Sequence, residues 1–175
     1  GATGPTGPTG AGAIIPFASG GELAVTVLVG GLAGLPGIIG FGNSSQLPSV
    51  LGATINIAGL TNYAFSMPRD GVITSLSAYL SVTAALTLLA PLTYTVQVYQ
   101  STTPDDVFTP VPGAAANIVI PGTINIGDTF NSTVTGLNIP VTAGTRLLLV
   151  CSASGGGLAI IGTVVGTVSA GLGIS

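Results

Sequence analysis

The chain has 175 residues and a mass of 16.9 kDa, and its charged residues are two arginines and five acids. This length suits one domain, but a charged fraction of 4% lies far below the ~25% of an ordinary soluble domain. Two arginines cannot neutralise a run of phosphates, which excludes nucleic-acid binding. Because Lys and His are absent and Cys151 is the one cysteine, we expect no enzyme activity, no cofactor and no metal site.

The mean hydropathy of +0.81, together with a net charge of -3, limits how the chain can exist in solution. Disorder requires low hydropathy and high charge, so we expect a folded chain. A surface with few charges gives weak repulsion between molecules. We therefore expect the fold to hide apolar surface in an oligomer or a larger assembly.

The first twelve residues have a strict period of three. From Gly1 to Gly10 glycine occupies every third position, and the period ends at Ala13. A collagen triple helix requires this pattern, because no larger residue fits at its axis. We interpret residues 1–12 as the end of a collagen-like stalk, with a flexible Gly/Pro/Thr linker as the alternative. Since the chain starts inside the repeat and without Met, we expect it to be a fragment of a longer protein.

Residues 13–175 consist of short β-type runs separated by turn residues. Val, Ile and Thr make up nearly a third of the chain, which favours strands. Gly30–Gly42 is too rich in Gly and Pro for a helix, and Thr83–Leu89 is expected to form a turn or a bulged hairpin. The predicted strands are, in chain order, Ala13–Ala18, Glu22–Val29, Gln46–Leu51, Thr54–Ala58, Asn62–Met67, Gly71–Val82, Leu92–Gln100, Ala116–Ile120, Thr123–Ile126, Asp128–Val134, Leu137–Val141, Arg146–Ser154 and Gly157–Val168.

These runs predict an all-β fold, an antiparallel jelly-roll sandwich with roughly ten strands. We expect a homotrimer, because a collagen-like stalk already joins three chains. Leu158–Leu172 could instead be a membrane helix, since Gly162-x-x-x-Gly166 is a pattern that packs helices in lipid. The stretch is shorter than the ~20 residues of a span and rich in β-branched residues, so we predict buried strands and no membrane span.

A subunit of such a trimer needs a sheet that is apolar on both faces, one toward its own core and one toward its neighbours. The runs that meet this condition are Leu86–Leu92, Leu147–Val150 and Leu158–Val168. Tyr79, Tyr94 and Tyr99 are expected at the contact, because aromatic side chains are enriched in interfaces. The predicted trimer-interface residues are Tyr94, Leu147, Leu149, Leu158, Ile160 and Val164.

Two polar motifs have both a structural and a functional interpretation. Arg69-Asp70-Gly71 matches an integrin-adhesion tripeptide, but Asp-Gly after a proline is typical of a tight turn, which we predict. We also expect Arg69 to pair with an acidic residue, in its own subunit or across subunits. The acids Asp105, Asp106 and Asp128 could form a calcium or catalytic site only if several converged, and we predict solvated loops instead. Cys151 is predicted to be a small buried apolar residue.

Five longer stretches carry a resemblance to a known family: AIIPFASG (Ala13–Gly20), GFGNS (Gly40–Ser44), YAFSMPRDGVITSLSAYLS (Tyr63–Ser81), STTPDDVFTPVPGA (Ser101–Ala114) and VTGLNIPVTAGTRLLLVCSAS (Val134–Ser154). On these stretches the chain resembles the C-terminal domain of the Bacillus collagen-like exosporium glycoproteins, most of all the BclB type. The resemblance extends essentially from end to end. It implies a homotrimeric jelly-roll head similar to those of complement C1q and tumour necrosis factor, with residues 1–12 as stalk and 13–175 as head.

The resemblance also implies a function and a location. The head would trimerise, nucleate the stalk and cap a structural fibre on a spore surface, at the exosporium or at the tip of a spore appendage. Such proteins are anchored to the spore basal layer or an appendage fibre through an N-terminal region that this sequence lacks. An adhesion module for host-matrix or cell-surface ligands is the alternative. In similar stalks the threonines of Gly-x-Thr triplets carry O-linked sugars, which makes Thr3, Thr6 and Thr9 candidate glycosylation sites.

Overall fold

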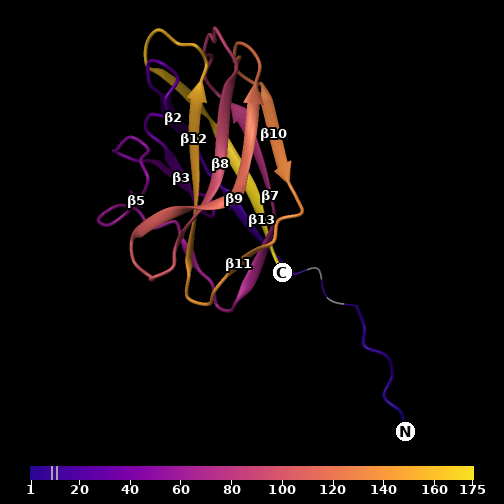
Figure 1. Ribbon diagram of the computed structural model, residues 1–175. Coiled ribbons are helices and arrows are strands. Elements are labelled where there is room, and N and C mark those ends of the chain that lie inside the picture. Colours follow the sequence, from indigo (N-terminus) through magenta and orange to yellow (C-terminus); the bar gives the residue numbers. More distant parts are fainter. Residues whose placement is uncertain (9, 11) are drawn as a thin grey trace.

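The computed structural model describes residues 1–8, 10 and 12–175, which form thirteen strands and no helix. Two antiparallel sheets lie face to face, and the N-terminal residues extend away from one end (Figure 1). Sheet A contains β1 (Ala13–Ala18), β2 (Leu23–Val27), β7 (Gly71–Val82), β10 (Thr129–Val134), β11 (Ile139–Val141) and β13 (Gly162–Ile174). Sheet B contains β3 (Gly37–Ile39), β4 (Ser44–Gln46), β5 (Ile55–Asn56), β6 (Phe65–Ser66), β8 (Leu92–Ser101), β9 (Val107–Ile120) and β12 (Arg146–Gly155).

The strand order joins segments that are far apart in the sequence. Sheet A has the order β1-β13-β7-β10, with β2 beside β13 and β11 beside β7. Sheet B has the order β4-β3-β12-β8-β9-β5, with β6 beside β12. The chain changes sheet repeatedly, for example from β7 to β8 at one end and from β11 to β12 at the other. The two sheets are therefore tied together at both ends of the sandwich.

The main core lies between the two sheets. In sheet A, alternate positions such as Leu80 of β7 and Val168 of β13 are buried against sheet B. Sheet B contributes Val96 of β8 and Leu149 of β12 to the same cluster. Each such side chain stabilises the fold by about 1.5–3 kcal/mol on leaving water. The predicted period of two is thus the direct cause of the sandwich.

A second apolar cluster lies on the outer face of sheet B. Residues 47–64, which we call the cover segment, cross this face and bury Ile55 against Phe108 of β9 and Leu148 of β12. Two backbone hydrogen bonds hold the start of the segment, from the Leu47 amide to the Pro36 carbonyl and from the Leu51 amide to the Gly34 carbonyl. Strand β12 is consequently buried on both faces within a single chain.

Several strand predictions are confirmed and others are wrong. Strands β1 and β7 occupy their predicted ranges. Gly30–Gly42 contains β3, which was not predicted, whereas only Gln46 of Gln46–Leu51 belongs to a strand, β4, and Thr123–Ile126 forms no named strand. Leu158–Leu172 forms a loop and part of β13 rather than a membrane helix. Among the residues described here, no helix has the length and apolar character needed to cross a membrane.

The chain enters and leaves sheet A at the same end. Strand β1 begins where β13 ends, with Ala13 opposite Ile174. Gly12 has a φ of 90°, and a Cβ there would clash with the Ile174 carbonyl oxygen, so this position requires glycine. The collagen-like residues therefore leave the sandwich beside its C-terminus (Figure 1), and we call this the stalk end.

Candidate functional site

Among the residues that the structure describes, no segment covers the outward face of sheet A as the cover segment covers sheet B. The side chains of this outward face come from the positions of β7, β10 and β13 that alternate with the core residues. The pairing register aligns them in rows across the sheet. We call this surface the uncharged face, and its residues are Ser77, Tyr79, Ser81, Thr129, Asn131, Thr133, Thr163, Val165, Thr167, Ser169 and Gly171.

Tyr79 is the one large side chain of the uncharged face. Tyr79 lies between Asn131 and Ser169 in the central row and is 42% exposed. In the next row the Ser77 and Thr133 hydroxyls share a hydrogen bond of 2.7 Å. A shallow hollow of about 300 Å³ lies beside Tyr79 and extends to Ser19. The arrangement offers a large ring and an adjacent depression on an otherwise smooth surface.

The chemistry of this face suits close contact with another apolar or weakly polar surface. It carries no charged side chain, so covering it removes no ionic group from water. Glycine and small hydroxyl residues also allow a neighbouring backbone or sheet to approach closely. The hydroxyls have no histidine, lysine or carboxylate beside them in the rows, so the face lacks a base to activate a nucleophile.

The residues predicted as a trimer interface lie elsewhere. Tyr94, Leu147, Leu149 and Val164 are buried in the core between the sheets, so a neighbouring subunit would not touch their side chains in this conformation. Leu158 is half-buried and packs against the same core, and Ile160 is 75% exposed in the β12–β13 loop.

Leu147 and Leu149 are buried because the chain itself covers both faces of β12. The alternate positions of β13 from Thr163 onward indicate an outward face, because Thr163, Thr167 and Ser169 among them carry hydroxyls. Of the three tyrosines expected at the contact, Tyr79 is on the uncharged face, whereas Tyr94 and Tyr99 are buried.

Arg146 holds the loops at the stalk end of sheet B together. Its guanidinium donates to the Asp106 carboxylate at 2.9 Å, to the Asn62 side-chain oxygen at 2.8 Å and to the Asp105 carbonyl. It also lies over the Phe108 ring, 5.1 Å from the centroid. This geometry joins the cover segment, the β8–β9 loop and β12, which is a structural role.

Three of the other acids, Asp105, Asp70 and Asp128, accept hydrogen bonds from nearby hydroxyl or amide groups. The Asp105 carboxylate accepts from the Ser101 hydroxyl and the Val107 amide, which lowers its pKa. Asp70 accepts from the Ala143 amide at 2.8 Å, and Asp128 from the Asn125 amide at 2.9 Å. Within the described part of the chain, no three His, Cys, Asp or Glu side chains gather in a group that could hold a metal ion.

Within the described residues of this single chain, Arg69 has no acidic side-chain partner, and a partner in another subunit stays a prediction. Its guanidinium donates to two backbone oxygens, those of Asp70 and Ser175. Pro68 and Arg69 form a bend directly before β7, in agreement with the predicted turn. Arg69 thus helps to fix the C-terminus beside the stalk end.

Cys151 is fully buried and free, as predicted. Burial raises the pKa of its thiol to about 12, so the thiol is protonated at neutral pH. Burial, followed by the neighbouring Cys151, raises the pKa of the Tyr94 phenol well above its usual value. A protonated, buried thiol is neither a nucleophile nor a metal ligand.

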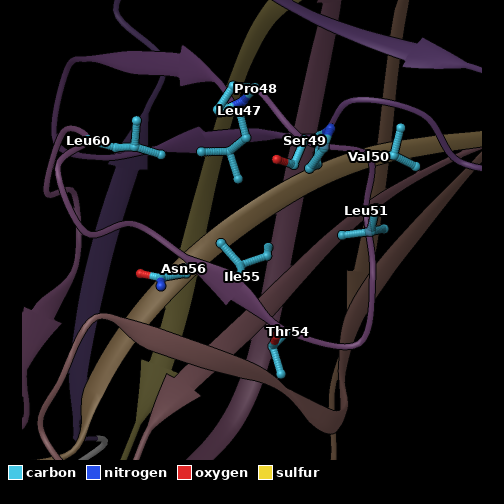
Figure 2. Close-up of a pocket in the computed structure, with 10 residues that line it drawn as sticks. Leu47, Pro48, Ser49, Val50, Leu51, Thr54, Ile55, Asn56 and Leu60 are labelled. Carbon is cyan, nitrogen blue, oxygen red and sulfur yellow. The ribbon is translucent and has the colours of Figure 1, made fainter.

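The remaining candidate features carry no acid–base chemistry. A groove of about 220 Å³ lies between the start of the cover segment and β5, and Figure 2 shows it lined by Leu47, Val50, Ile55 and Leu60.

Among the candidate glycosylation sites, Thr3 and Thr6 are exposed. Thr9 lies outside the described residues.

Fold and site together define an antiparallel β-sandwich that follows collagen-like triplets and presents one broad uncharged face. No family model matches the chain. The chain is 36% identical, over 183 aligned residues, to Collagen-like protein 1 of Acanthamoeba polyphaga mimivirus. The alignment covers 97% of the chain, so the similarity includes the sandwich and not only the triplets. This similarity supports a collagen-like family, although the chain spans only 19% of that relative.

Proposed function

We propose that this chain is the C-terminal head of a collagen-like fibre protein, and that three copies associate through the uncharged face. The observation that carries the proposal is the position of that face. It belongs to the same sheet whose edge strand, β1, continues directly from the collagen-like triplets. A face on this sheet can meet two others when three stalks converge.

The strand order supports a jelly roll of the C1q and tumour necrosis factor type. The four-strand paths β1-β13-β7-β10 and β3-β12-β8-β9, with connections that alternate between sheets, are the arrangement expected of that fold. The buried core of about thirty side chains lets each head fold by itself. Association would then need no domain swapping.

The proposed mechanism is nucleation. Forming the first turns of a triple helix is costly because three chains must be aligned at once, and a trimeric head aligns their ends before the helix forms. A contact of roughly 1,600 Å² or more in total is typical of stable association. The head would then cap the fibre and hold the three chains in register.

The location is a separate part of the proposal. The resemblance to exosporium glycoproteins supports a spore-surface fibre, at the exosporium or an appendage tip, anchored through a region N-terminal to this sequence. O-linked sugars on Thr3, Thr6 and Thr9 would solvate a stalk that has no charges. Because Lys, His and an accessible thiol are all lacking, we expect the head to have no catalytic turnover.

The native mass of the purified chain, measured by light scattering after gel filtration, tests the trimer. We expect three times 16.9 kDa for the wild type. Val165→Asp/Thr167→Asp places two charges on the uncharged face and should give monomers or aggregates. Thr109→Asp, at an exposed position of β9 in the other sheet, and Thr102→Asp in the β8–β9 loop are controls that should stay trimeric. A monomeric wild type, or a trimeric double variant, would contradict the proposal.

A further inference from the structure

Exposed apolar side chains gather at the end of the sandwich opposite the stalk end. Six of the thirteen large, exposed hydrophobic residues lie there, each between 57% and 75% exposed. They come from the loops β2–β3, β7–β8, β9–β10 and β12–β13, which meet at the end farthest from the N-terminus in Figure 1. We call this group the apolar tip, and its residues are Val29, Leu32, Leu89, Ile126, Ile160 and Ile161.

The four loops are bonded to one another through their backbones. The Gly155 amide donates to the Gly31 carbonyl, which joins β12–β13 to β2–β3. The Leu89 amide donates to the Gly156 carbonyl, which joins β7–β8 to β12–β13. Leu86 and Ile124 exchange two hydrogen bonds of 2.9 Å, which joins β7–β8 to β9–β10. The tip is therefore a connected unit, and many of its backbone polar groups already have protein partners.

Internal pairing of the backbone is the condition for entering an apolar medium. A peptide group that loses water without another partner costs several kcal/mol in hydrocarbon, roughly 4–8 on a cyclohexane scale. Because these loops pair with one another, that cost is reduced where the tip would be immersed. An ordinary solvent-facing loop would leave more of these groups dependent on water.

The distribution of charged residues also favours contact of the tip with an apolar medium. The two arginines are at positions 69 and 146, near the stalk end, so no cation on the tip attracts an anionic headgroup or an acidic protein. The one acid in these loops is Asp128, whose carboxylate is held by the Asn125 amide. The six side chains also project from four different loops and do not line a groove.

We propose that the apolar tip inserts into the uncharged acyl boundary of a lipid bilayer. Leu and Ile side chains would leave water there, each favouring the bound state by roughly tenfold or more. The inference does not depend on the trimer, although three tips on one fibre would strengthen attachment through multivalency. It also gives the proposed adhesion module a specific surface and a specific chemistry.

Single-tryptophan variants test the insertion directly, because the natural chain has no Trp. Ile160→Trp should shift its emission to the blue with vesicles of neutral phosphatidylcholine, and brominated acyl chains should quench it. The matched control is Val50→Trp, on the cover segment and 51% exposed in the natural chain, which should show neither change. Both substitutions keep the position apolar, so folding is preserved, and a thermal melt of each variant checks this.

Sedimentation with the same vesicles gives the affinity. Leu89→Ser/Ile160→Ser should reduce the affinity for the vesicles by roughly a hundredfold. Val50→Ser/Leu60→Ser should leave that affinity unchanged. Binding should persist at about 1 M salt, where exposed charges are screened. The proposal fails if neutral vesicles do not bind, if binding requires anionic lipid, or if the tip variant binds as the wild type does. It also fails if Ile160→Trp responds only to a protein partner or to a second copy of the chain.

Discussion

Cys151 and Tyr94 face the same core from neighbouring strands, β12 and β8, and both hold a proton more tightly than they would in water. Their charged forms would have to exist without solvent, so the folded chain favours the neutral forms. A group whose pKa is raised on folding stabilises the fold fully below its unfolded pKa. That contribution is lost as the pH rises from the unfolded value toward the folded one.

We therefore predict that the free energy of unfolding is nearly constant between pH ~4 and ~9 and declines at higher pH. For Cys151 the decline spans the interval from an unfolded pKa near 8.5 to a folded pKa of about 12. Urea unfolding at several pH values measures it. The decline should be shallower in Cys151→Ala and Tyr94→Phe, and an unchanged slope in both would contradict the assignment.

At low pH the free energy of unfolding should change with pH in the opposite direction. Hydrogen bonds lower the pKa of Asp105 in the folded state, so its contribution is present above the unfolded pKa and is lost as the pH falls below about 4. Asp105→Asn should remove part of this acid loss.

Elements with a strong periodic signal could be predicted from sequence, and elements defined by their neighbours could not. Strand β7 alternates between buried and outward positions from Leu76 to Val82, and both β1 and β7 are bounded by turn residues, so their limits were predicted. Strand β3 is hidden in Gly30–Gly42, where composition argues against any regular element. It is a strand because Ile38 and Ile39 pair with Val150 and Leu149 of β12. Tertiary contact overrides local propensity there.

The same distinction explains why several residues predicted at a trimer interface are buried within the chain. Leu147–Val150 is apolar on both faces, which indicates burial on both sides. The pattern does not say whether a neighbouring subunit or the chain itself provides the second cover. Here the cover segment does so, although only Ile55–Asn56 of it forms a strand. The uncharged face was overlooked because Ser and Thr rows are also typical of ordinary solvent-facing sheet.

Two glycines of β13 allow a matched prediction about strand packing. A Cβ at Gly166 would collide with the Ser81 carbonyl oxygen of β7, whereas a Cβ at Gly171 would make only an ordinary contact, 3.9 Å from Ile14. Gly166→Ala should therefore destabilise the fold by about 1–3 kcal/mol, because β13 and β7 must separate locally. Gly171→Ala should change stability by less than about 1 kcal/mol. Urea unfolding of both variants measures the two changes in the free energy of unfolding. Equal changes would show that the sheet adjusts freely at Gly166.

At the scale of the whole molecule, the head should determine how the stalk assembles. We predict that a longer Gly-Pro-Thr stalk forms a triple helix more readily and melts higher when it is fused to this chain than when it is free. Aligned chain ends reduce the cost of nucleation, which is the physical reason. Circular dichroism of the stalk during heating and cooling measures this, with Val165→Asp/Thr167→Asp as the control that should abolish the difference. Identical melting of free and fused stalks would show that the head does not nucleate.

The antiparallel pair β1–β13 has a mechanical consequence for a fibre under tension. A pull on the stalk acts along β1, away from the sandwich that holds β13. The six residue pairs from Ala13–Ile174 to Ala18–Ser169 then carry the load together in shear, because their hydrogen bonds lie across the direction of pull. A pull between residue 12 and the C-terminus would instead open the same pairs one at a time. The head should thus resist a force applied through its stalk far better than the same force applied between its two ends.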